Sequence, residues 1–426
     1  MNETICALAT AAGGALGIIR ISGEQSLEIL SAVFDKDLRE ARPNTVHYGH
    51  IVTGTEVIDE VLVSVFRAPH SYTGEDSAEI SCHGSLYILN KVIEILIQHG
   101  CRMAHPGEFT QRAYLNGKMD LSQAEAVADL IASTNKATHH LAMSQLRGGI
   151  STELSRLRDH LLRLTSLLEL ELDFSDHEDL EFADRTELLQ LATTIEAHIG
   201  RLTKSFETGN ALKNGIPVAI VGAPNVGKST LLNALLGEER AIVSDQQGIT
   251  RDAIEDTIIL GGITFRFIDT AGIRHTTDRI EQMGIERSMA AAQRARIILM
   301  MTEPGIPYPD MPICDDQTVI HIENKTDAFQ AKYGIGLDHL RQQLVAAVPT
   351  FSDSDTIITN ARHYDALTRA LDSIHRVIEG LNAELTGDLL SEDLRQTLDI
   401  LAEITGGQIT PQETLNTIFS HFCVGK

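Results

Sequence analysis

An eight-residue run, Gly222-Ala-Pro-Asn-Val-Gly-Lys-Ser229, constrains the fold of this 426-residue chain more than any other feature. The apolar residues 217–221 lead into it, and an apolar helix is expected from Thr230. Strand, glycine-rich loop and helix in this order are typical of a phosphate-binding loop, whose N–H groups and helix N-terminus point at phosphates. Lys228 is expected to reach the β- and γ-phosphates, and Ser229 to bind Mg²⁺.

Two further motifs indicate which nucleotide is bound. An expected strand ends at Asp269 and continues as Asp-Thr-Ala-Gly to Gly272, which places a carboxylate near the water shell of the metal and an N–H group near the γ-phosphate. Another apolar strand leads into Asn324-Lys-Thr-Asp327. Asp327 is expected to accept two hydrogen bonds that guanine offers and adenine does not. Three motifs in this order predict a Ras-like α/β GTPase.

The residues expected to act in hydrolysis match the usual GTPase pattern less fully than the phosphate loop does. Thr250 lies between the first two motifs, where a switch threonine would cover Mg²⁺. Ile273 follows Gly272, so the glutamine that orients the attacking water in many GTPases is missing at that position. Another group is therefore expected to act on the water.

Charge and cysteine usage exclude several classes of protein. The 59 acidic against 35 basic residues give a formal net charge of −24, so any nucleic-acid contact must be local or supplied by a partner. The five cysteines form no closely spaced pair, which indicates a reducing compartment. The longest apolar run, residues 297–301, is too short for a bilayer, and no basic run precedes the first apolar stretch. We expect a cytoplasmic protein without a membrane segment.

Apolar periodicity predicts the organisation of the chain. Residues 1–118 combine alternating strands, such as the one with Val61, Val63 and Val65, with a periodic helix, which predicts an α+β domain. Leucine and isoleucine stripes at residues 154–168, 188–202 and 367–381 predict long amphipathic helices.

The stripes lie on both sides of the nucleotide motifs, and narrow stripes need helical partners. We therefore expect a discontinuous all-α domain, residues 119–209 plus 349–426, with the GTPase domain, residues 210–348, inserted into it. A further helix carrying Leu394 is expected to be capped by Ser391.

Several blocks outside the nucleotide motifs are absent from generic GTPases. They read Gly17-Ile-Ile-Arg-Ile-Ser-Gly23, Tyr72-Thr-Gly-Glu-Asp76, Cys82-His-Gly84, Pro106-Gly-Glu-Phe-Thr110, Asn116-Gly-Lys-Met-Asp-Leu-Ser-Gln-Ala-Glu125 and Phe422-Cys-Val-Gly-Lys426. With them, the chain resembles the MnmE/TrmE family of tRNA modification GTPases over nearly its full length. The resemblance implies that residues 1–118 form a tetrahydrofolate-binding and dimerisation domain.

The resemblance also implies a reaction and partners. The family forms a homodimer that hydrolyses GTP to GDP and works with the flavoprotein MnmG/GidA. It adds a carboxymethylaminomethyl or aminomethyl group to carbon 5 of the wobble uridine of certain tRNAs. The one-carbon unit comes from a 5-formyl- or methylene-tetrahydrofolate. The implied folate contacts are Arg20, Glu79, Lys118 and Lys426, in which the cations would meet carboxylates or the formyl oxygen and Glu79 the pterin donor edge.

Members of the family use K⁺ in place of an arginine finger. The implied K⁺ ligands are Asn225, Ser244, Gln246 and Ile249, and the implied Mg²⁺ ligands are Ser229 and Thr250. Glu281 would orient the water, with Asp269 and Lys228 completing the catalytic set. The implied GTP-binding residues are Asn225, Val226, Gly227, Lys228, Ser229, Thr230, Ser244, Thr250, Asp269, Gly272, Asn324, Lys325 and Asp327.

Two features depart from the family pattern. Ile249 replaces a usual threonine, so K⁺ keeps that ligand only if it is the backbone carbonyl. Four prolines between residues 304 and 312 prevent a regular helix, and only three residues separate Asp327 from Ala331-Lys332, the expected remnant of the last guanine motif. The GTPase domain is therefore predicted to be shortened.

Two rival functions remain open at this point. A ribosome-assembly or regulatory GTPase would be a binding switch without modification chemistry, and it predicts a basic RNA-binding appendage that this acidic chain does not show. A folate-dependent one-carbon transferase with a degenerate GTPase domain gains weight from the shortened region.

Overall fold

The structure is a computed structural model, and it describes residues 3–173, 185–238, 256–268, 289–349, 356–407, 412–420 and 422–425. The chain divides into two compact units. Unit 1 comprises Met1–Ala128, Leu146–Ser151 and Asp399–Lys426, and unit 2 comprises Asp129–Gln145 and Thr152–Leu398. This division follows compactness, and the boundaries of the three expected domains stay a prediction.

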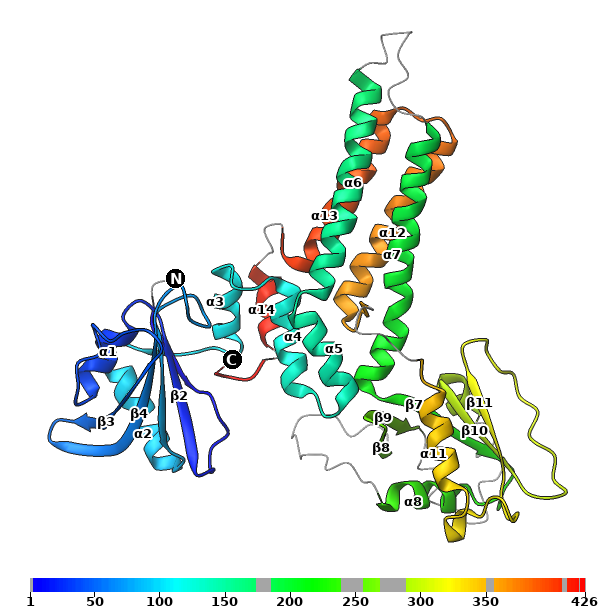
Figure 1. The fold of residues 1–426 in the computed structure, drawn as a ribbon, viewed down its shortest axis with the longest axis horizontal. Coiled ribbons are helices and arrows are strands. Elements are labelled where there is room, and N and C mark those ends of the chain that lie inside the picture. The colour runs from blue at the N-terminus through cyan, green and yellow to red at the C-terminus, as the bar shows by residue number, and fades with distance from the viewer. Residues whose placement is uncertain are drawn as a thin grey trace. The chain divides into compact units, whose positions relative to one another are not determined.

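Unit 1 contains a six-stranded mixed sheet. Its strands β1 (Ile5–Leu8), β2 (Leu16–Ser22), β3 (Thr45–Thr53), β4 (Glu56–Phe66), β5 (Ser77–His83) and β6 (Arg102–Met103) lie in the order β3-β4-β5-β2-β1-β6. Only β1 and β6 run parallel among these described pairs. Helices α1 (Ser26–Val33) and α2 (Leu86–Gln98) pack on the sheet (Figure 1). Val61, Val63 and Val65 are buried in the resulting core, which confirms the predicted alternation.

The C-terminal segment packs within unit 1. Besides α3 (Glu108–Leu115), this unit holds the start of α4 (Leu121–Ala132) and all of α14 (Gln412–Ser420). Leu121, Ala124 and Val127 form one apolar cluster with Leu415, Phe419 and Phe422. Gly107 has φ of 68°, and a Cβ there would lie 2.8 Å from the carbonyl oxygen of Phe419. A glycine is therefore required where the C-terminal segment meets α3.

A buried ion network joins α3 to the strands of unit 1. Glu108 is 4% exposed and accepts hydrogen bonds from Arg102 Nη2 at 2.7 Å and Arg112 Nη2 at 3.0 Å. Arg112 also donates to both carboxylate oxygens of Glu75 at 3.1 Å. Burial opposes the negative charge of Glu108, but hydrogen bonds from Arg102, the His105 backbone N–H and Arg112 outweigh it and lower its pKa to about 2.

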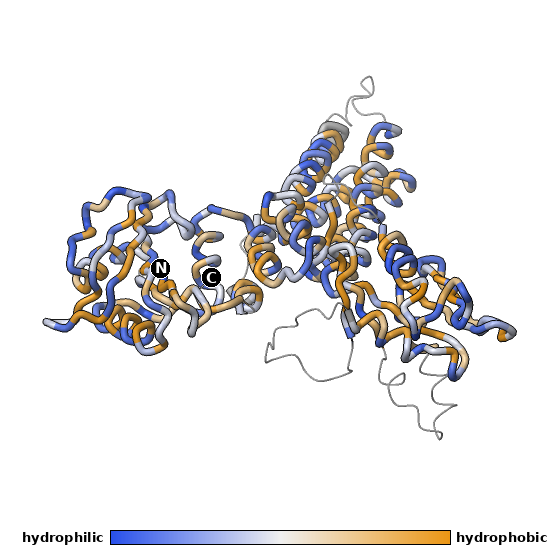
Figure 2. The backbone as a smooth tube through the Cα atoms, turned by 60° about the horizontal axis from the view of Figure 1, so that its bottom comes forward, coloured by the Kyte–Doolittle hydropathy of each residue, from blue (hydrophilic) through white to orange (hydrophobic). Residues whose placement is uncertain are grey.

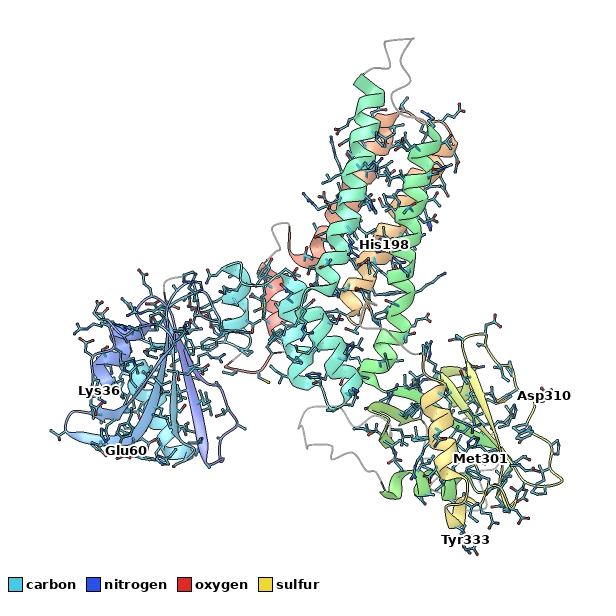
Figure 3. The ribbon with its side chains drawn as sticks, in the orientation of Figure 1. Lys36, Glu60, His198, Met301, Asp310 and Tyr333 are labelled. Atoms are coloured by element: carbon cyan, nitrogen blue, oxygen red, sulfur yellow. The ribbon has the colours of Figure 1, made fainter. Side chains whose placement is uncertain are left out.

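Unit 2 contains all or most of each long helix that the leucine stripes predict. The three stripes lie on α6 (Gly149–Asp173), α7 (Arg185–Asn214) and α12 (Ala361–Asn382), and the further helix with Leu394 is α13 (Gly387–Thr405). The unit also holds most of α5 (Lys136–Leu146), which no stripe predicts. The five stripe leucines of α6 are all buried: Leu154, Leu157, Leu161, Leu164 and Leu168. Orange and blue alternate along these helices in Figure 2, as expected where one face is apolar. His198 of α7, labelled in Figure 3, contacts Glu153 of α6 at 2.7 Å.

The expected cap at Ser391 is wrong. Helix α13 already begins at Gly387, and Ser391 lies one turn inside it. Its hydroxyl donates to the Gly387 carbonyl at 2.8 Å, which is the bond that a serine makes within a helix rather than at its start.

Unit 2 also contains a five-stranded sheet with the phosphate-loop motif at its centre. Strands β7 (Ile216–Gly222), β8 (Asp256–Leu260), β9 (Ile263–Phe267), β10 (Ile297–Thr302) and β11 (Thr318–Glu323) lie in the order β11-β10-β7-β9-β8. The pairs are parallel except the hairpin of β8 and β9. Helices α8 (Lys228–Glu238) and α11 (Leu337–Ala346) share one apolar core with the sheet. This is the doubly wound order in which ligands bind beyond the carboxyl ends of the strands.

The structure confirms that this sheet domain is shortened. A parallel crossover normally contains a helix, but residues 303–317, which join β10 to β11 and are all described, form none. The proline-rich composition accounts for this, since proline lacks the N–H group that a helix needs. Between β11 and α11 the described chain has only the short 3₁₀ helix η1 (Ala331–Tyr333), and β11 is the edge strand.

We predict that Glu108 makes the stability of the chain depend on acid. Its pKa is lower in the folded state than its usual 4.5, so its contribution is present above pH 4.5 and is lost as the pH falls toward 2. That contribution is about 3 kcal/mol. Glu108→Gln should lower the urea midpoint at pH 7 and flatten its fall between pH 5 and 3, measured by circular dichroism.

The matched control is Glu94→Gln on α2, which removes a carboxylate that is 52% exposed and paired with Lys91 at the surface. The control should reproduce the acid profile of the unchanged chain. An identical slope for Glu108→Gln would show that the buried network does not set the acid response.

Candidate functional site

The glycine-rich loop joins the end of β7 to the start of α8 in unit 2. Both of its glycines are required by close contacts. A Cβ at Gly222 would lie 2.4 Å from the Met301 carbonyl oxygen, and a Cβ at Gly227, whose φ is 99°, would lie 2.4 Å from Nδ2 of Asn324. Lys228 Nζ donates to the carbonyl oxygens of Gly222 and Ala223, each at 2.8 Å. Burial lowers the pKa of Lys228, because the ammonium group is partly removed from water.

Asn324 connects this loop to two other segments of the domain. The residue is 5% exposed and directly follows β11. Its Nδ2 donates to the Val226 carbonyl oxygen at 2.8 Å, and its Oδ1 accepts from the Ala331 N–H at 3.0 Å. Its own N–H donates to the Thr302 carbonyl oxygen at 2.8 Å. One residue thereby fixes the phosphate loop, the end of the sheet and the segment at Ala331 relative to one another.

The remaining residues of the Asn324–Asp327 motif form a tight loop. Lys325 has φ of 62°, and its Nζ donates to the Asn225 carbonyl oxygen at 3.4 Å. The N–H of Thr326 donates to the Phe329 carbonyl oxygen at 3.1 Å, and Oγ1 of Thr326 accepts from the N–H of Phe329 at 3.1 Å. Asp327 is exposed beside them. Of the phosphate-loop residues, Val226 is buried, whereas Asn225 and Thr230 are exposed.

Several predicted site residues lie outside the described residues. Strand β9 is followed by one further described residue, which precedes the predicted metal-site aspartate. The residues concerned are Ser244, Gln246, Ile249, Thr250, Asp269, Gly272, Glu281 and Lys426. Their roles in nucleotide, metal and folate binding stay predictions.

In unit 1 the structure brings two predicted folate residues together. Arg20 on β2 and Glu79 on β5 are register partners across two antiparallel strands. Nη2 of Arg20 lies 2.7 Å and its Nε 3.0 Å from Oε1 of Glu79. The side chains are 15% and 29% exposed, so the pair is reachable from solvent on one side.

The surroundings of Arg20 contain groups that the sequence analysis did not assign. Its guanidinium carbon lies 5.4 Å from the ring centre of Tyr72 and 5.5 Å from that of Phe109. Its Nη1 donates to the Gly425 carbonyl oxygen at 3.3 Å. Tyr72 and Phe109 belong to two of the sequence blocks quoted above, and that membership is the signal that could have identified them. Lys118, by contrast, is an exposed residue whose Nζ donates to the Pro69 carbonyl oxygen at 2.8 Å.

Two searches of the described residues bear on membranes and metals. In the part of the chain that the structure describes, none of the helices has the length and apolar character that a bilayer span requires. Within the same ranges, no three histidine, cysteine, aspartate or glutamate side chains converge as a metal-binding group.

Comparison with known proteins finds a matching family model for each of two segments of the chain. A family model described as the GTP-binding protein TrmE N-terminus matches residues 4–118, and one described as the MnmE helical domain matches residues 121–423. The tRNA modification GTPase MnmE of Bacteroides fragilis is 53% identical, and that of Phocaeicola vulgatus 54% identical. These alignments cover 100% of this chain and 100% and 99% of the respective relatives.

The relatives are longer than this chain. The alignment with the Bacteroides fragilis protein runs over 465 positions against 426 residues here, so at least 39 positions have no residue in this chain. The crystal structure of a variant of Aquifex aeolicus Era bound to GDP and AlF₄⁻ is 25% identical and covers 37% of this chain and 65% of its own, but its TM-score of 0.23 is too low to establish a shared fold. Matched by both family models and more than half identical to full-length relatives, the chain belongs to the family of the tRNA modification GTPase MnmE.

Proposed function

We propose that this chain hydrolyses GTP at the loop between β7 and α8 and that this turnover supports modification of the wobble uridine of tRNA. The observation that carries the GTPase part is the contact set of Asn324. Its amide joins the phosphate loop at Val226 to Ala331, where the remnant of the last guanine motif is proposed. These contacts support the proposal because they bring the phosphate loop and the segment proposed for the base together at one end of the sheet, where such domains bind nucleotides.

Each part of the nucleotide would meet a different group. Lys228 would exchange its two backbone carbonyl partners for the β- and γ-phosphates, to which its charge is better suited. Asp327, exposed beside Lys325, would accept the hydrogen bonds of the guanine edge. The Asp269 carboxylate would lie near the water shell of the metal, Gly272 would offer its N–H group to the γ-phosphate, and Glu281 would orient the water.

The chain also offers donors for the two cations of the proposal. Ser229, in the first turn of α8, is placed to supply a hydroxyl to Mg²⁺, with Thr250 as its proposed second protein ligand. Asn225 is exposed and has φ of 63°, so its side-chain amide is accessible and is proposed as a K⁺ ligand. Ser244, Gln246 and Ile249 are proposed as the other K⁺ ligands. Bound cations would neutralise charge that develops on the phosphates during hydrolysis.

In unit 1 we propose a tetrahydrofolate site around Arg20 and Glu79. The partly exposed ring of Tyr72 lies beside the guanidinium and offers apolar surface for a planar ring system, and the fully buried ring of Phe109 supports the guanidinium from the core. Lys118 and Lys426 would add positive charge for carboxylates. The proposal includes a homodimer, the flavoprotein MnmG as partner for the uridine chemistry, a 5-formyl- or methylene-tetrahydrofolate as the one-carbon source, and a cytoplasmic location.

The rival functions fit the observations less well. A one-carbon transferase with a degenerate GTPase domain would have no reason to keep the Asn324 contacts or the two close glycine contacts of the loop. A ribosome-assembly GTPase needs a basic surface, whereas this chain has a net charge of −24.

The tRNA part of the proposal predicts a change in nucleosides. A bacterial strain that lacks its own MnmE should regain the modified wobble uridine when it expresses this chain, and should not regain it with Lys228→Ala. Mass spectrometry of digested tRNA makes the measurement. Normal growth with unmodified wobble uridine would favour a regulatory GTPase instead.

The cation part of the proposal predicts a difference between salts. Purified chain should hydrolyse GTP faster in KCl than in NaCl of equal ionic strength by about tenfold or more, because the cation takes the place of an arginine finger. Phosphate release is the measurement, and Lys228→Ala gives the background rate. Equal rates in the two salts would reject the K⁺ site, with Ile249 as the first residue to examine.

The folate part predicts a difference between two similar lysines. Lys118→Met should weaken binding of 5-formyl-tetrahydrofolate about tenfold, because one charge-assisted hydrogen bond is lost, and should leave GTP affinity unchanged. Lys36→Met is the control, since Lys36 is also a lysine of unit 1 whose Nζ donates to a backbone carbonyl, that of Tyr48. Titration calorimetry measures both. Equal affinities in the two variants would remove Lys118 from the site.

A further inference from the structure

Glu303 is the first residue after β10 and lies next to the candidate nucleotide site. Its carboxylate forms an ion pair with Nζ of Lys325. Oε2 of Glu303, the atom of this contact, is shielded from solvent. The Glu303 side chain as a whole is 25% exposed, against 55% for Lys325. The shielded Oε2 atom of Glu303 therefore holds the end of a side chain that is about half exposed.

The backbone around Glu303 fixes the position of its carboxylate. Thr302 Oγ1 donates to the Ile306 carbonyl oxygen, and the N–H of Ile306 donates to the Glu303 carbonyl oxygen at 3.0 Å. Gly305, with φ of 87°, allows the chain to close this turn. The turn opens the connection of residues 303–317, which replaces a crossover helix, and it leaves the Glu303 side chain beside the end of β11.

Without the Glu303 carboxylate, the side chain of Lys325 would be held only weakly in place. Lys325 is not a glycine, yet its φ is 62°, a conformation that costs free energy for a side-chain-bearing residue. Its hydrogen bond to the Asn225 carbonyl oxygen is long, at 3.4 Å, and therefore weak. The ion pair with Glu303 is the stronger of the two contacts and keeps the ammonium group above the phosphate loop.

We propose that Glu303 is a positioning residue for guanine-nucleotide binding, acting through Lys325. By holding Lys325 against the carbonyl of Asn225, it ties the loop of residues 324–327 to the phosphate loop before a nucleotide binds. This inference rests on the proposed function, because it assumes that a guanine nucleotide binds at this loop. A preset side chain lowers the ordering cost of binding and leaves the chemical step unchanged.

The test is a comparison of Glu303→Gln with the unchanged full-length chain. The variant should raise KM for GTP and the dissociation constant of a fluorescent GDP by about threefold to tenfold, with kcat within about twofold. Glu303→Asp, which keeps the charge on a shorter stem, should recover part of the affinity. Asp310→Asn is the control, since it removes an exposed carboxylate from the same connection, at a position labelled in Figure 3.

A double-mutant cycle separates positioning from a general structural role. In a Lys325→Met background, Glu303→Gln should have no additional effect on GDP affinity. The circular dichroism melting curve of the nucleotide-free Glu303→Gln variant should match that of the unchanged chain. Unchanged affinity in Glu303→Gln, additive losses in the cycle or a matching loss of stability would overturn the proposal. Failure of the unchanged chain to bind GDP would instead overturn the proposed function.

Discussion

The side-chain amide of Asn324 is the contact on which the nucleotide-binding end of unit 2 depends. It uses both its donor and its acceptor on backbone groups, at Val226 and at Ala331, and is almost completely buried. An aspartate or a leucine of similar size could not satisfy both groups, so either would leave a buried polar atom without a partner. The absence of a Cβ at Gly227 makes room for this amide. The glycine of the loop and the asparagine after β11 therefore form one structural element although their positions lie 97 apart in the sequence.

This element explains how the domain tolerates its lost segments. The connection of residues 303–317 has no helix, and a single 3₁₀ turn stands between β11 and α11. Both simplified connections begin at residues that contact the site, Thr302 and Asn324. The strands that precede them keep their parallel register, β11 with β10 and β10 with β7. The shortening thus affects the connections between the strands and leaves the carboxyl ends of the central strands intact.

Much of the fold and part of the site could be predicted from the sequence, because the signals are local. The stripe of α6 and the alternation of β4 follow from burial of one face, and the two loop glycines follow from the motif. Other features depend on contacts that no local pattern reveals. The Arg20–Glu79 pair requires the register of β2 and β5, and Glu303 looks like an ordinary solvated acid in the sequence. Ser391 misled the prediction of a helix start, because a serine inside a helix and a serine at its cap differ only in context.

The C-terminal segment gives unit 1 an unusual order of completion during synthesis. Residues 399–426 belong to the same compact unit as the first strands, and a Cβ at Gly425 would lie 2.3 Å from the Leu8 carbonyl oxygen. A ribosome releases the six-stranded sheet early, but the residues that pack against α4 and accept a hydrogen bond from Arg20 emerge only after all of unit 2 has been translated. Until then, Leu121, Ala124 and Val127 lack their apolar partners, and Arg20 lacks the Gly425 carbonyl. The surroundings of Arg20 are therefore completed only on chains in which the nucleotide-binding sheet has already been made.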